Sequence, residues 1–385
     1  MLVRNLCLLR FVVGLLQSIL SSFLSSADTL TIKSLDGLRG LAVLLVLLSH
    51  MSIAQIHLLP VLDFSGLGKA GVYLFFSLSA FLLTWQALEA GAANLKDPKY
   101  WFGYLLRRVL RIYPLYALAL TVSFVLTRYA PGYSPSIGSA EELLRHLLLL
   151  QGNSIYWAIP VEFLYYLLLP LVVFVLFVSA RAHPFAPTAI VIALISACHQ
   201  IWPAHETPPN SISLGYYLTI FFLGSLTANW CTLQRVKSFK DQYHVLAITG
   251  YLALIIATLT IPSLWRALIN SEATNQAFHR DFLLYGIIWS VCILAAMRAS
   301  TIFTALFEST ALRLLGRISF SIYLWHYLII FFVARQTPIH AGLQFLLVIL
   351  VTLPLSWLSY QFIERPFISW GHRRTNPWQE AMRSQ

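Results

Sequence analysis

The sequence predicts an all-α, polytopic membrane protein: a helical bundle of about ten spans with both termini in the cytoplasm. Of its 385 residues, 58% are hydrophobic and 11% are charged, whereas soluble domains carry about 25% charged residues. The apolar runs are continuous and approach the roughly 20 residues that a helix needs to cross a bilayer. In a ten-span topology, 20 of the 26 Lys and Arg residues fall on the side of the N-terminus. Because cytoplasmic loops are enriched in basic residues, this bias places both termini in the cytoplasm. We expect a multi-pass protein of the inner (plasma) membrane.

Short connections join most of the predicted spans. The spans lie near 37–58, 68–88, 106–127, 156–178, 186–202, 213–232, 244–262, 281–298, 315–334 and 341–362. Longer connections are expected at 89–105, 128–155 and 263–280. Glu364 and Arg365 are predicted to pair at the inner interface and to end the last span before Pro366.

The two ends of the chain differ from the spans. One membrane domain is expected over residues 31–370, followed by a basic cytoplasmic tail over 371–385. The apolar run within residues 1–30 is short for a span. Three interpretations compete for it: an interfacial helix, a signal-like segment, or translation from an upstream start codon. We favour an interfacial or dispensable extension.

Charge and cysteine usage argue against several kinds of site. The formal net charge of +11 follows the distribution expected for cytoplasmic loops, so no nucleic-acid partner is predicted. The four cysteines are scattered without metal-ligand spacing, so neither a metal site nor a disulfide is expected. No permanently bound cofactor is expected, and membrane lipid is a predicted partner.

The stretch SLDGLRGLAVLLVLLSH, residues 34–50, carries a histidine into an apolar helix. Asp36 and Arg39 are three residues apart and share a helix face at its start. His50 follows about 16 Å further along the axis, near the middle of the hydrocarbon layer. A structural histidine bonded to a carbonyl group is the ordinary alternative. A titratable group at that depth is costly and usually functional, so we assign His50 to the active site.

Three arginines open the third span, in the segment YLLRRVLRIYPLY. Anchoring at the cytoplasmic interface would account for two of them. Arg107, Arg108 and Arg111 exceed that need, and planar guanidinium groups suit phosphate oxygens. The cluster therefore predicts a phosphorylated ligand that enters from the cytoplasm.

Two further ionisable residues are expected at membrane depth. Glu162 lies in an aromatic segment near the outer end of the fourth span, where a carboxylate needs a partner. His326 shares one face of the ninth span with Ser319 and Tyr323. The ordinary alternatives are a surface glutamate and a polar stripe that joins helices. Together with the arginines, these groups indicate a ligand whose reactive end lies within the membrane.

These motifs together resemble the acyltransferase 3 family, the membrane-bound O-acyltransferases that acetylate bacterial surface glycans. The matching segments are SLDGLRGLAVLLVLLSH, GKAGVYLFFSLSAFLL, RRVLRIYP, WAIPVEFLYY, ISFSIYLWH and ERP. They occur in the family's order and span residues 32–370. The resemblance implies ten core helices, cytoplasmic acyl-CoA as donor, and a glycan or glycoside hydroxyl as acceptor across the membrane.

The resemblance also assigns roles to single residues. It implies that Arg39 and His50 form an essential pair. It implies that Arg108 and Arg111 match the RxxR motif for the donor, and that Glu162 is the acidic residue of the fourth span.

Two departures from the family pattern are expected to matter. The usual SGF triplet of the second span reads SAF here, with Ala80 at its centre, which should tighten packing without removing chemistry. Some members carry a soluble hydrolase-like domain after the membrane domain, and this sequence ends at Gln385 without one. We therefore expect the chain to act alone or with a separate periplasmic transfer protein.

The predicted reaction moves an acyl group, acetyl before succinyl or a longer one, from acyl-CoA to a glycan hydroxyl. His50 would act as a general base or be acylated transiently. The residues predicted to bind the donor are Arg39, Arg107, Arg108 and Arg111.

Other polar residues are given supporting roles. Glu162 would orient or protonate His50, or position the acceptor. His326 with Tyr323 would stabilise the thioester oxyanion, which needs a donor already in place. Asp36, Trp157, Ser319 and Tyr323 are predicted to support the site.

The competing function is a transporter or flippase for a glycan or a lipid-linked sugar. Its buried charges would then be relays instead of catalysts. The sequence has neither inverted repeats nor paired broken helices, which such transporters often carry. Consumption of acyl-CoA separates the two functions, because a transporter releases its substrate unchanged.

Overall fold

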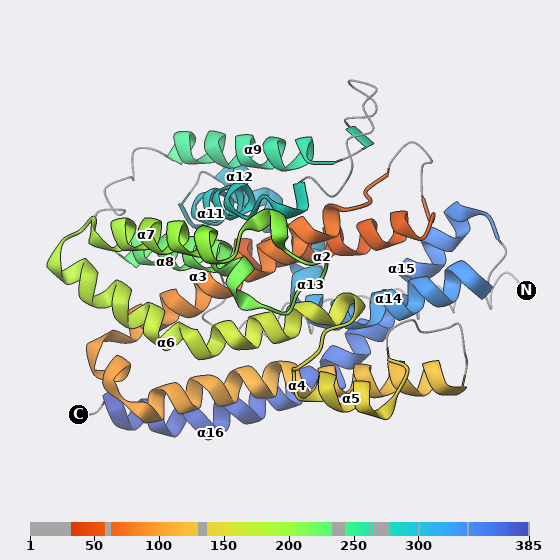
Figure 1. The fold of residues 1–385 in the computed structure, drawn as a ribbon, viewed down its shortest axis with the longest axis horizontal. Coiled ribbons are helices and arrows are strands. Elements are labelled where there is room, and N and C mark those ends of the chain that lie inside the picture. Colours follow the sequence, from red (N-terminus) through yellow and green to blue (C-terminus); the bar gives the residue numbers. More distant parts are fainter. Residues whose placement is uncertain are drawn as a thin grey trace, which may run out of the picture.

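The computed structural model describes residues 32–57, 63–129, 137–232, 243–261, 263–264, 278–298, 301–336 and 339–383. Within these ranges the chain forms helices and no β-strand (Figure 1), which confirms the predicted all-α class. The predicted extension over residues 1–30 lies outside them.

The helices follow one another with short connections. In chain order they are α2 (Lys33–Ile53), α3 (Leu67–Lys96), α4 (Pro98–Tyr129), α5 (Ala140–Leu147), α6 (Ala158–Ala182), α7 (Ala186–Ile201), α8 (Leu218–Thr232), α9 (Tyr243–Leu259), α11 (Phe282–Arg298), α12 (Thr301–Phe307), α13 (Thr310–Arg317), α14 (Ser319–Gln336), α15 (Ala341–Ser359) and α16 (Arg365–Arg383). Short 3₁₀ turns occur at η1 (Ser154–Trp157), η2 (Ala204–Glu206), η3 (Leu214–Tyr217) and η5 (Phe278–Arg280), and a π-helical turn η6 (Tyr360–Glu364) joins α15 to α16.

The described helices are those of a membrane protein. Five of them are long and apolar enough to cross a bilayer: α2, α3, α4, the η1–α6 segment and the α15–α16 segment. A sixth candidate is the pair α13–α14, bent by 78° at its break. Each of the ten predicted spans overlaps a helix. Helices α7, α9 and α11 have only 16 or 17 residues, fewer than the roughly 20 that a perpendicular span needs.

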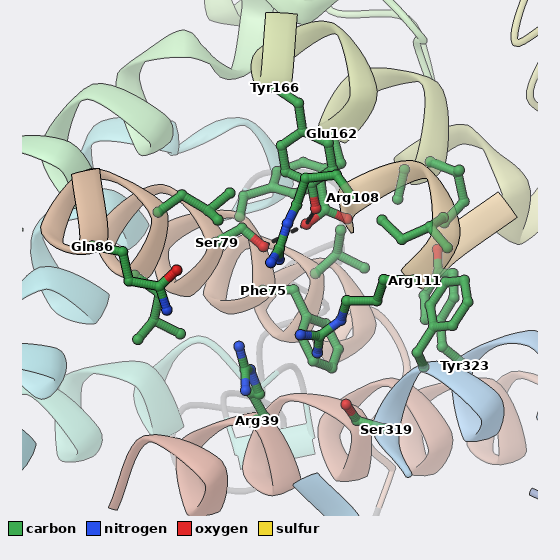
Figure 2. Close-up of a pocket in the computed structure, with 18 residues that line it drawn as sticks. Arg39, Phe75, Ser79, Gln86, Arg108, Arg111, Glu162, Tyr166, Ser319 and Tyr323 are labelled. Carbon is green, nitrogen blue, oxygen red and sulfur yellow. Dashed lines mark hydrogen bonds between the residues drawn. The ribbon is translucent and has the colours of Figure 1, made fainter. Parts of the chain in front are cut away.

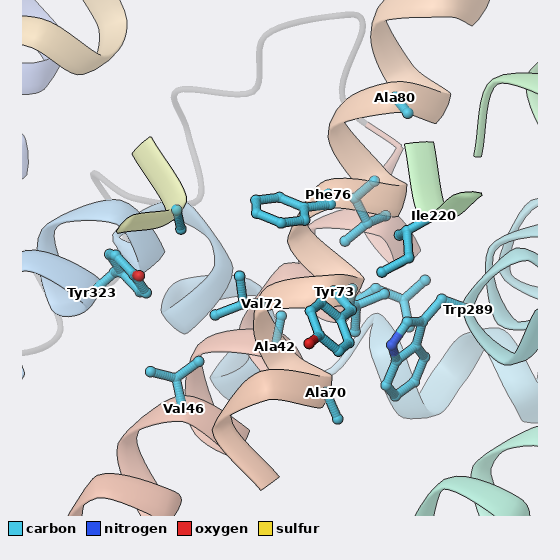
Figure 3. Packing of buried hydrophobic residues seen from close by; sticks show 14 of the residues in the cluster. Ala42, Val46, Ala70, Val72, Tyr73, Phe76, Ala80, Ile220, Trp289 and Tyr323 are labelled. Carbon is cyan, nitrogen blue, oxygen red and sulfur yellow. The ribbon is translucent and has the colours of Figure 1, made fainter. Parts of the chain in front are cut away.

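Helices α2 and α3 form the centre of the bundle. α2 packs against α3, α11, α12, α13 and α14, and α3 packs in turn against α6 and α8. Figure 3 shows Tyr73 and Phe76 of α3 in one buried cluster with Ala42 and Val46 of α2, and with Ile220 and Trp289. The two helices approach closely because Gly71 has no side chain: a Cβ there would lie 2.4 Å from the carbonyl oxygen of Ala42. Small residues permit such contacts between membrane helices.

The prediction of a long connection over 89–105 is wrong. α3 continues to Lys96, bent at Gly91 where φ is 82°, and α4 begins at Pro98. The segment is rich in alanine, which favours helix, and proline is tolerated in a helix's first turn. Only Asp97 separates the two helices.

The predicted connection over 128–155 contains the amphipathic helix α5. The Oγ of Ser139 caps it by accepting from the backbone N–H of Glu142 at 3.1 Å. The Glu142 carboxylate in turn accepts from the N–H of Gly138 at 2.7 Å. This is a capping box with its return bond shifted by one residue, and the S-x-x-E spacing could have predicted the helix.

The last span does not end before Pro366. The π-helical turn η6 leads directly into α16, which packs along α4 (Figure 1) and includes most of the predicted tail. The predicted pair between Glu364 and Arg365 is also wrong. Glu364 accepts a hydrogen bond from Ser321, whereas Arg365 donates to Gln361 at 3.2 Å. Adjacent side chains on a helix point about 100° apart, so they rarely form an ion pair with each other.

Candidate functional site

A cavity opens between α2, α3, α4, α6 and α14 (Figure 2). It contains about 870 Å³ of empty volume, part of it open to solvent. One wall is apolar and includes Val72, Phe75 and Phe76 of α3. All five helices contribute polar side chains, which converge on the same space.

Three guanidinium groups point into this cavity: Arg39 from α2, and Arg108 and Arg111 from α4 (Figure 2). They are close enough for their charges to interact. Two carboxylates partly compensate this charge: Oδ1 of Asp36 lies 3.3 Å from an Nη of Arg39, and Glu162 lines the same cavity. The remaining positive charge favours an anionic ligand.

The third arginine of the predicted cluster lies elsewhere. Arg107 directs its Nη1 to the hydroxyl of Thr375 on α16, at 2.7 Å, and does not line the cavity. Arg108 is the opposite case: its Nε is buried and has no hydrogen-bond partner among the described residues. Since buried N–H groups are almost always bonded, this orphaned donor fits a site for phosphate oxygens.

Glu162 faces the arginines from the first turns of α6. Its Oε1 accepts hydrogen bonds from Ser79 and, at 2.5 Å, from the hydroxyl of Tyr166. The carboxylate also interacts electrostatically with Arg108. Within the described part of the chain it makes no hydrogen bond to His50. Glu162 therefore belongs to the arginine cavity.

The two predicted histidines meet directly. Nδ1 of His50 lies 3.0 Å from Nε2 of His326, and Nδ1 of His326 lies 3.0 Å from the carbonyl oxygen of Ile322. A carbonyl oxygen can only accept, so in the neutral ring the Nδ1 of His326 carries the hydrogen. Nε2 of His326 then accepts from Nδ1–H of His50. This chain of bonds leaves the lone pair of His50 on Nε2.

The two rings of this histidine pair differ in solvent exposure. His326 is fully buried, whereas His50 is half-buried. The ring of His50 also interacts with the backbone of Val46, and its one side-chain hydrogen bond within the described residues is the one to His326. Both ring nitrogens of His326 are occupied. The arrangement suits His50 as the base or nucleophile and His326 as the group that orients it.

Tyr323 connects the cavity to the histidine pair. Its side chain lines the cavity together with Ser319, one turn earlier on α14, and its ring centroid lies 6.0 Å from that of His326. The hydroxyl donates to the carbonyl oxygen of Ile155 at 2.5 Å. Its one hydrogen is thus already used, which leaves none for an oxyanion.

Sequence reasoning missed three polar residues of this region. Ser79 and Tyr166 hold Glu162, and Lys69 places its Nζ 4.0 Å from the centroid of the Trp157 ring. Tyr166 is four residues after Glu162, a spacing that puts both on one helix face and could have indicated the contact. The other two depend on packing between helices, which no local spacing records.

The sequence is similar to a family of known proteins. The family model described as an acyltransferase domain matches residues 32–361. A Bacillus subtilis protein, provisionally named peptidoglycan O-acetyltransferase YrhL, is 26% identical over 389 residues, which cover 89% of this chain and 56% of the relative. The O-acetyltransferase OatA of Staphylococcus aureus is 23% identical over 89% of this chain and 58% of its own length.

The chain thus spans little more than half the length of these curated relatives. No solved structure gives a significant match. The family match covers the cavity, the histidine pair and the helices that carry them. The chain belongs to the acyltransferase 3 family.

Proposed function

We propose that the protein is a membrane O-acyltransferase. It moves an acyl group, acetyl in the first instance, from acyl-CoA to a hydroxyl of an extracytoplasmic glycan. The observation that carries this proposal is the arrangement of two sites: a cavity with three arginines, and a histidine pair that Tyr323 joins to it. The names of the relatives, O-acetyltransferases of which one is named for peptidoglycan, support acetyl transfer to a glycan.

The proposed topology has ten membrane-inserted segments and both termini in the cytoplasm. It rests on the bias of 20 basic residues among 26 toward one side. Helices too short for a perpendicular span would insert among the longer ones. In this orientation α2 begins at the cytoplasmic face, so Arg39 lies nearer the cytoplasm than His50. The arginine cavity then receives a donor from the cytoplasm, and the plasma membrane is the proposed location.

The donor's phosphates fit the arginine cavity. Arg108 and Arg111 would each bind two phosphate oxygens of coenzyme A through parallel hydrogen bonds. Arg39 would be the third cation of the site. Hydrogen bonds to the coenzyme A phosphates would replace those to water that the guanidinium groups lose on burial. The apolar wall of the cavity would cover the pantetheine arm, directing the thioester toward Tyr323 and the histidine pair.

The transfer step uses the lone pair of His50. Its Nε2 removes the proton of the acceptor hydroxyl as the hydroxyl oxygen bonds to the thioester carbonyl carbon. The carbon–sulfur bond then breaks, and the coenzyme A thiolate takes the proton from His50. In the alternative route, Nε2 attacks the thioester carbonyl carbon, the carbon–sulfur bond breaks, and the coenzyme A thiolate leaves an acyl-histidine behind. The acceptor hydroxyl then takes the acyl group, and its proton passes to the thiolate. Intact mass measured with acyl-CoA alone distinguishes the two, because only the second route adds an acyl group to the protein.

Replacing both Arg108 and Arg111 with alanine is expected to lower the affinity for acyl-CoA by at least about 100-fold. Each residue would lose a charge-assisted hydrogen bond to phosphate, worth about 1.5–3 kcal/mol. Calorimetry or fluorescence titration of the purified protein in lipid nanodiscs measures the change. Arg107→Ala is the matched control, since it removes a guanidinium from the same helix turn but outside the cavity. Equal affinity in the double variant and the wild type would contradict the donor site, and absence of any acyl-CoA binding would favour a transporter.

His326→Ala is expected to slow transfer by about 100-fold without weakening acyl-CoA binding, because misplacing a catalytic group by 1 Å can cost that much. The variant removes the acceptor of the Nδ1–H of His50. His326→Gln, whose side-chain oxygen also accepts, should recover part of the rate. The pH profile of kcat should change in His326→Ala and return toward wild type in His326→Gln. A profile that is the same in both variants would mean that His326 only fills space.

A further inference from the structure

A second pocket lies between two connections of the chain: residues 150–154, which lead into α6, and residues 209–212, which lead into α8. It contains about 830 Å³ of empty volume, part of it open to solvent. All the described side chains that line it are uncharged, and four of them are polar. These are Gln151, Asn153, Ser154 and Asn210.

The walls of this outer pocket are held in place. The backbone N–H of Asn153 donates to Nε2 of His146 at 2.9 Å, and burial lowers the pKa of His146, which favours the neutral ring that can accept. Positive φ angles, costly for residues other than glycine, concentrate here. They occur at Leu149 (59°), Ser154 (52°) and Asn210 (55°). Backbone strain of this kind tends to cluster at ligand-binding sites.

Lys69 joins the outer pocket to the histidine pair. Its Nζ donates to Oδ1 of Asn210 at 2.6 Å. One residue earlier, Gly68 packs on α2, where a Cβ would lie 3.2 Å from Oγ of Ser49, the neighbour of His50. The charge of Lys69 is close enough to act on His50. The outer pocket and the accessible ring of the pair therefore lie at the same end of α2.

The arginine cavity lies further toward the start of α2. Arg39 precedes His50 by eleven residues, about 16 Å along the helix axis. A donor held by the arginines and a second substrate in the outer pocket would thus approach His50 from different ends of α2. Two substrates need two entrances, and the two pockets lie toward different ends of α2.

We propose that the outer pocket binds the acceptor sugar and presents one of its hydroxyls to Nε2 of His50. This inference rests on the proposed acyl transfer and names the acceptor's binding site. Side-chain amides both donate and accept hydrogen bonds, as sugar hydroxyls do, so Gln151 and Asn210 suit a polyhydroxylated ligand. The uncharged lining favours a neutral part of a saccharide over a phosphorylated one. The bound hydroxyl oxygen replaces sulfur on the acyl carbon, and its proton passes through His50 to the coenzyme A thiolate.

The test compares sugar binding with donor binding in the full chain, purified in lipid nanodiscs. Soluble peptidoglycan strands serve as the probe. Gln151→Ala and Asn210→Gly each remove one amide, and glycine keeps the positive φ at residue 210. Both variants should raise the Kd for strands, and the KM in the transfer assay, by about 5-fold, the usual contribution of one hydrogen bond. Acyl-CoA affinity should stay at the wild-type value.

His205→Ala is the matched control, because His205 is an exposed residue before the same connection and outside the pocket lining. Strand binding unchanged in both pocket variants would overturn the inference, and so would wild-type protein that binds no strands. An equal loss of strand and acyl-CoA affinity would also overturn it, since the effect would then come from the fold. Strand binding that depends on Asn210 without acyl-CoA turnover would retain the pocket and reject the proposed acyl transfer.

Discussion

Transfer is expected to fall by about 10²- to 10⁴-fold when His50 is replaced with alanine, the usual contribution of a general acid–base group. The variant removes the half-buried ring whose Nε2 carries the available lone pair. His326 loses its partner but keeps its bond to Ile322, so the helix that carries it should stay in place. Release of coenzyme A thiol in the presence of acceptor measures the loss.

Two observations keep this result interpretable. Acyl-CoA binding should be unchanged in His50→Ala, because His50 does not line the arginine cavity. His183→Ala is the control for losing a histidine, since His183 is exposed in the connection between α6 and α7. Wild-type transfer rates in His50→Ala would contradict its assignment and leave the histidine pair a structural role.

Gly316→Ala is expected to destabilise the protein by about 3 kcal/mol or more, at or above the upper end of the usual cost of overpacking. A Cβ at this position would lie 1.8 Å from the backbone carbonyl oxygen of Asp36. A backbone atom cannot rotate away as a side chain can, so α13 must move off α2. The movement would displace Asp36 and, with it, Arg39 at the cavity wall. Thermal unfolding in nanodiscs and acyl-CoA affinity should both decline.

Gly138→Ala provides the comparison for this prediction. The nearest atom to a Cβ at Gly138 is an oxygen of the Glu142 side chain at 3.6 Å, an ordinary contact. Its effect on unfolding should stay within about 0.5 kcal/mol, as for most surface substitutions. If both glycine variants unfolded at the wild-type temperature, the close approach of α13 to α2 would be refuted.

The sequence by itself determined the fold class and the helices that carry the site. A bilayer leaves an exposed backbone no hydrogen-bond partners, so continuous apolar runs in this composition must be helices. Depth along one helix also follows from sequence, because each residue adds about 1.5 Å. The placement of His50 well beyond Arg39 on α2 is of this kind. Connections were expected at helix α5 and at the junction around Asp97, although the S-x-x-E spacing and the alanine content there indicate helix.

Tertiary structure alone decided which polar groups meet. His50 and His326 are 276 residues apart and form one hydrogen-bonded pair, while Glu162 is held by Ser79 and Tyr166 instead of His50. Arg107 and Arg108 are neighbours in sequence, yet only Arg108 lines the cavity. The physical reason is that helix periodicity fixes the direction of a side chain relative to its own helix. Which other helix packs against that face depends on contacts such as those of Gly71 and Gly316, which residue spacing does not record.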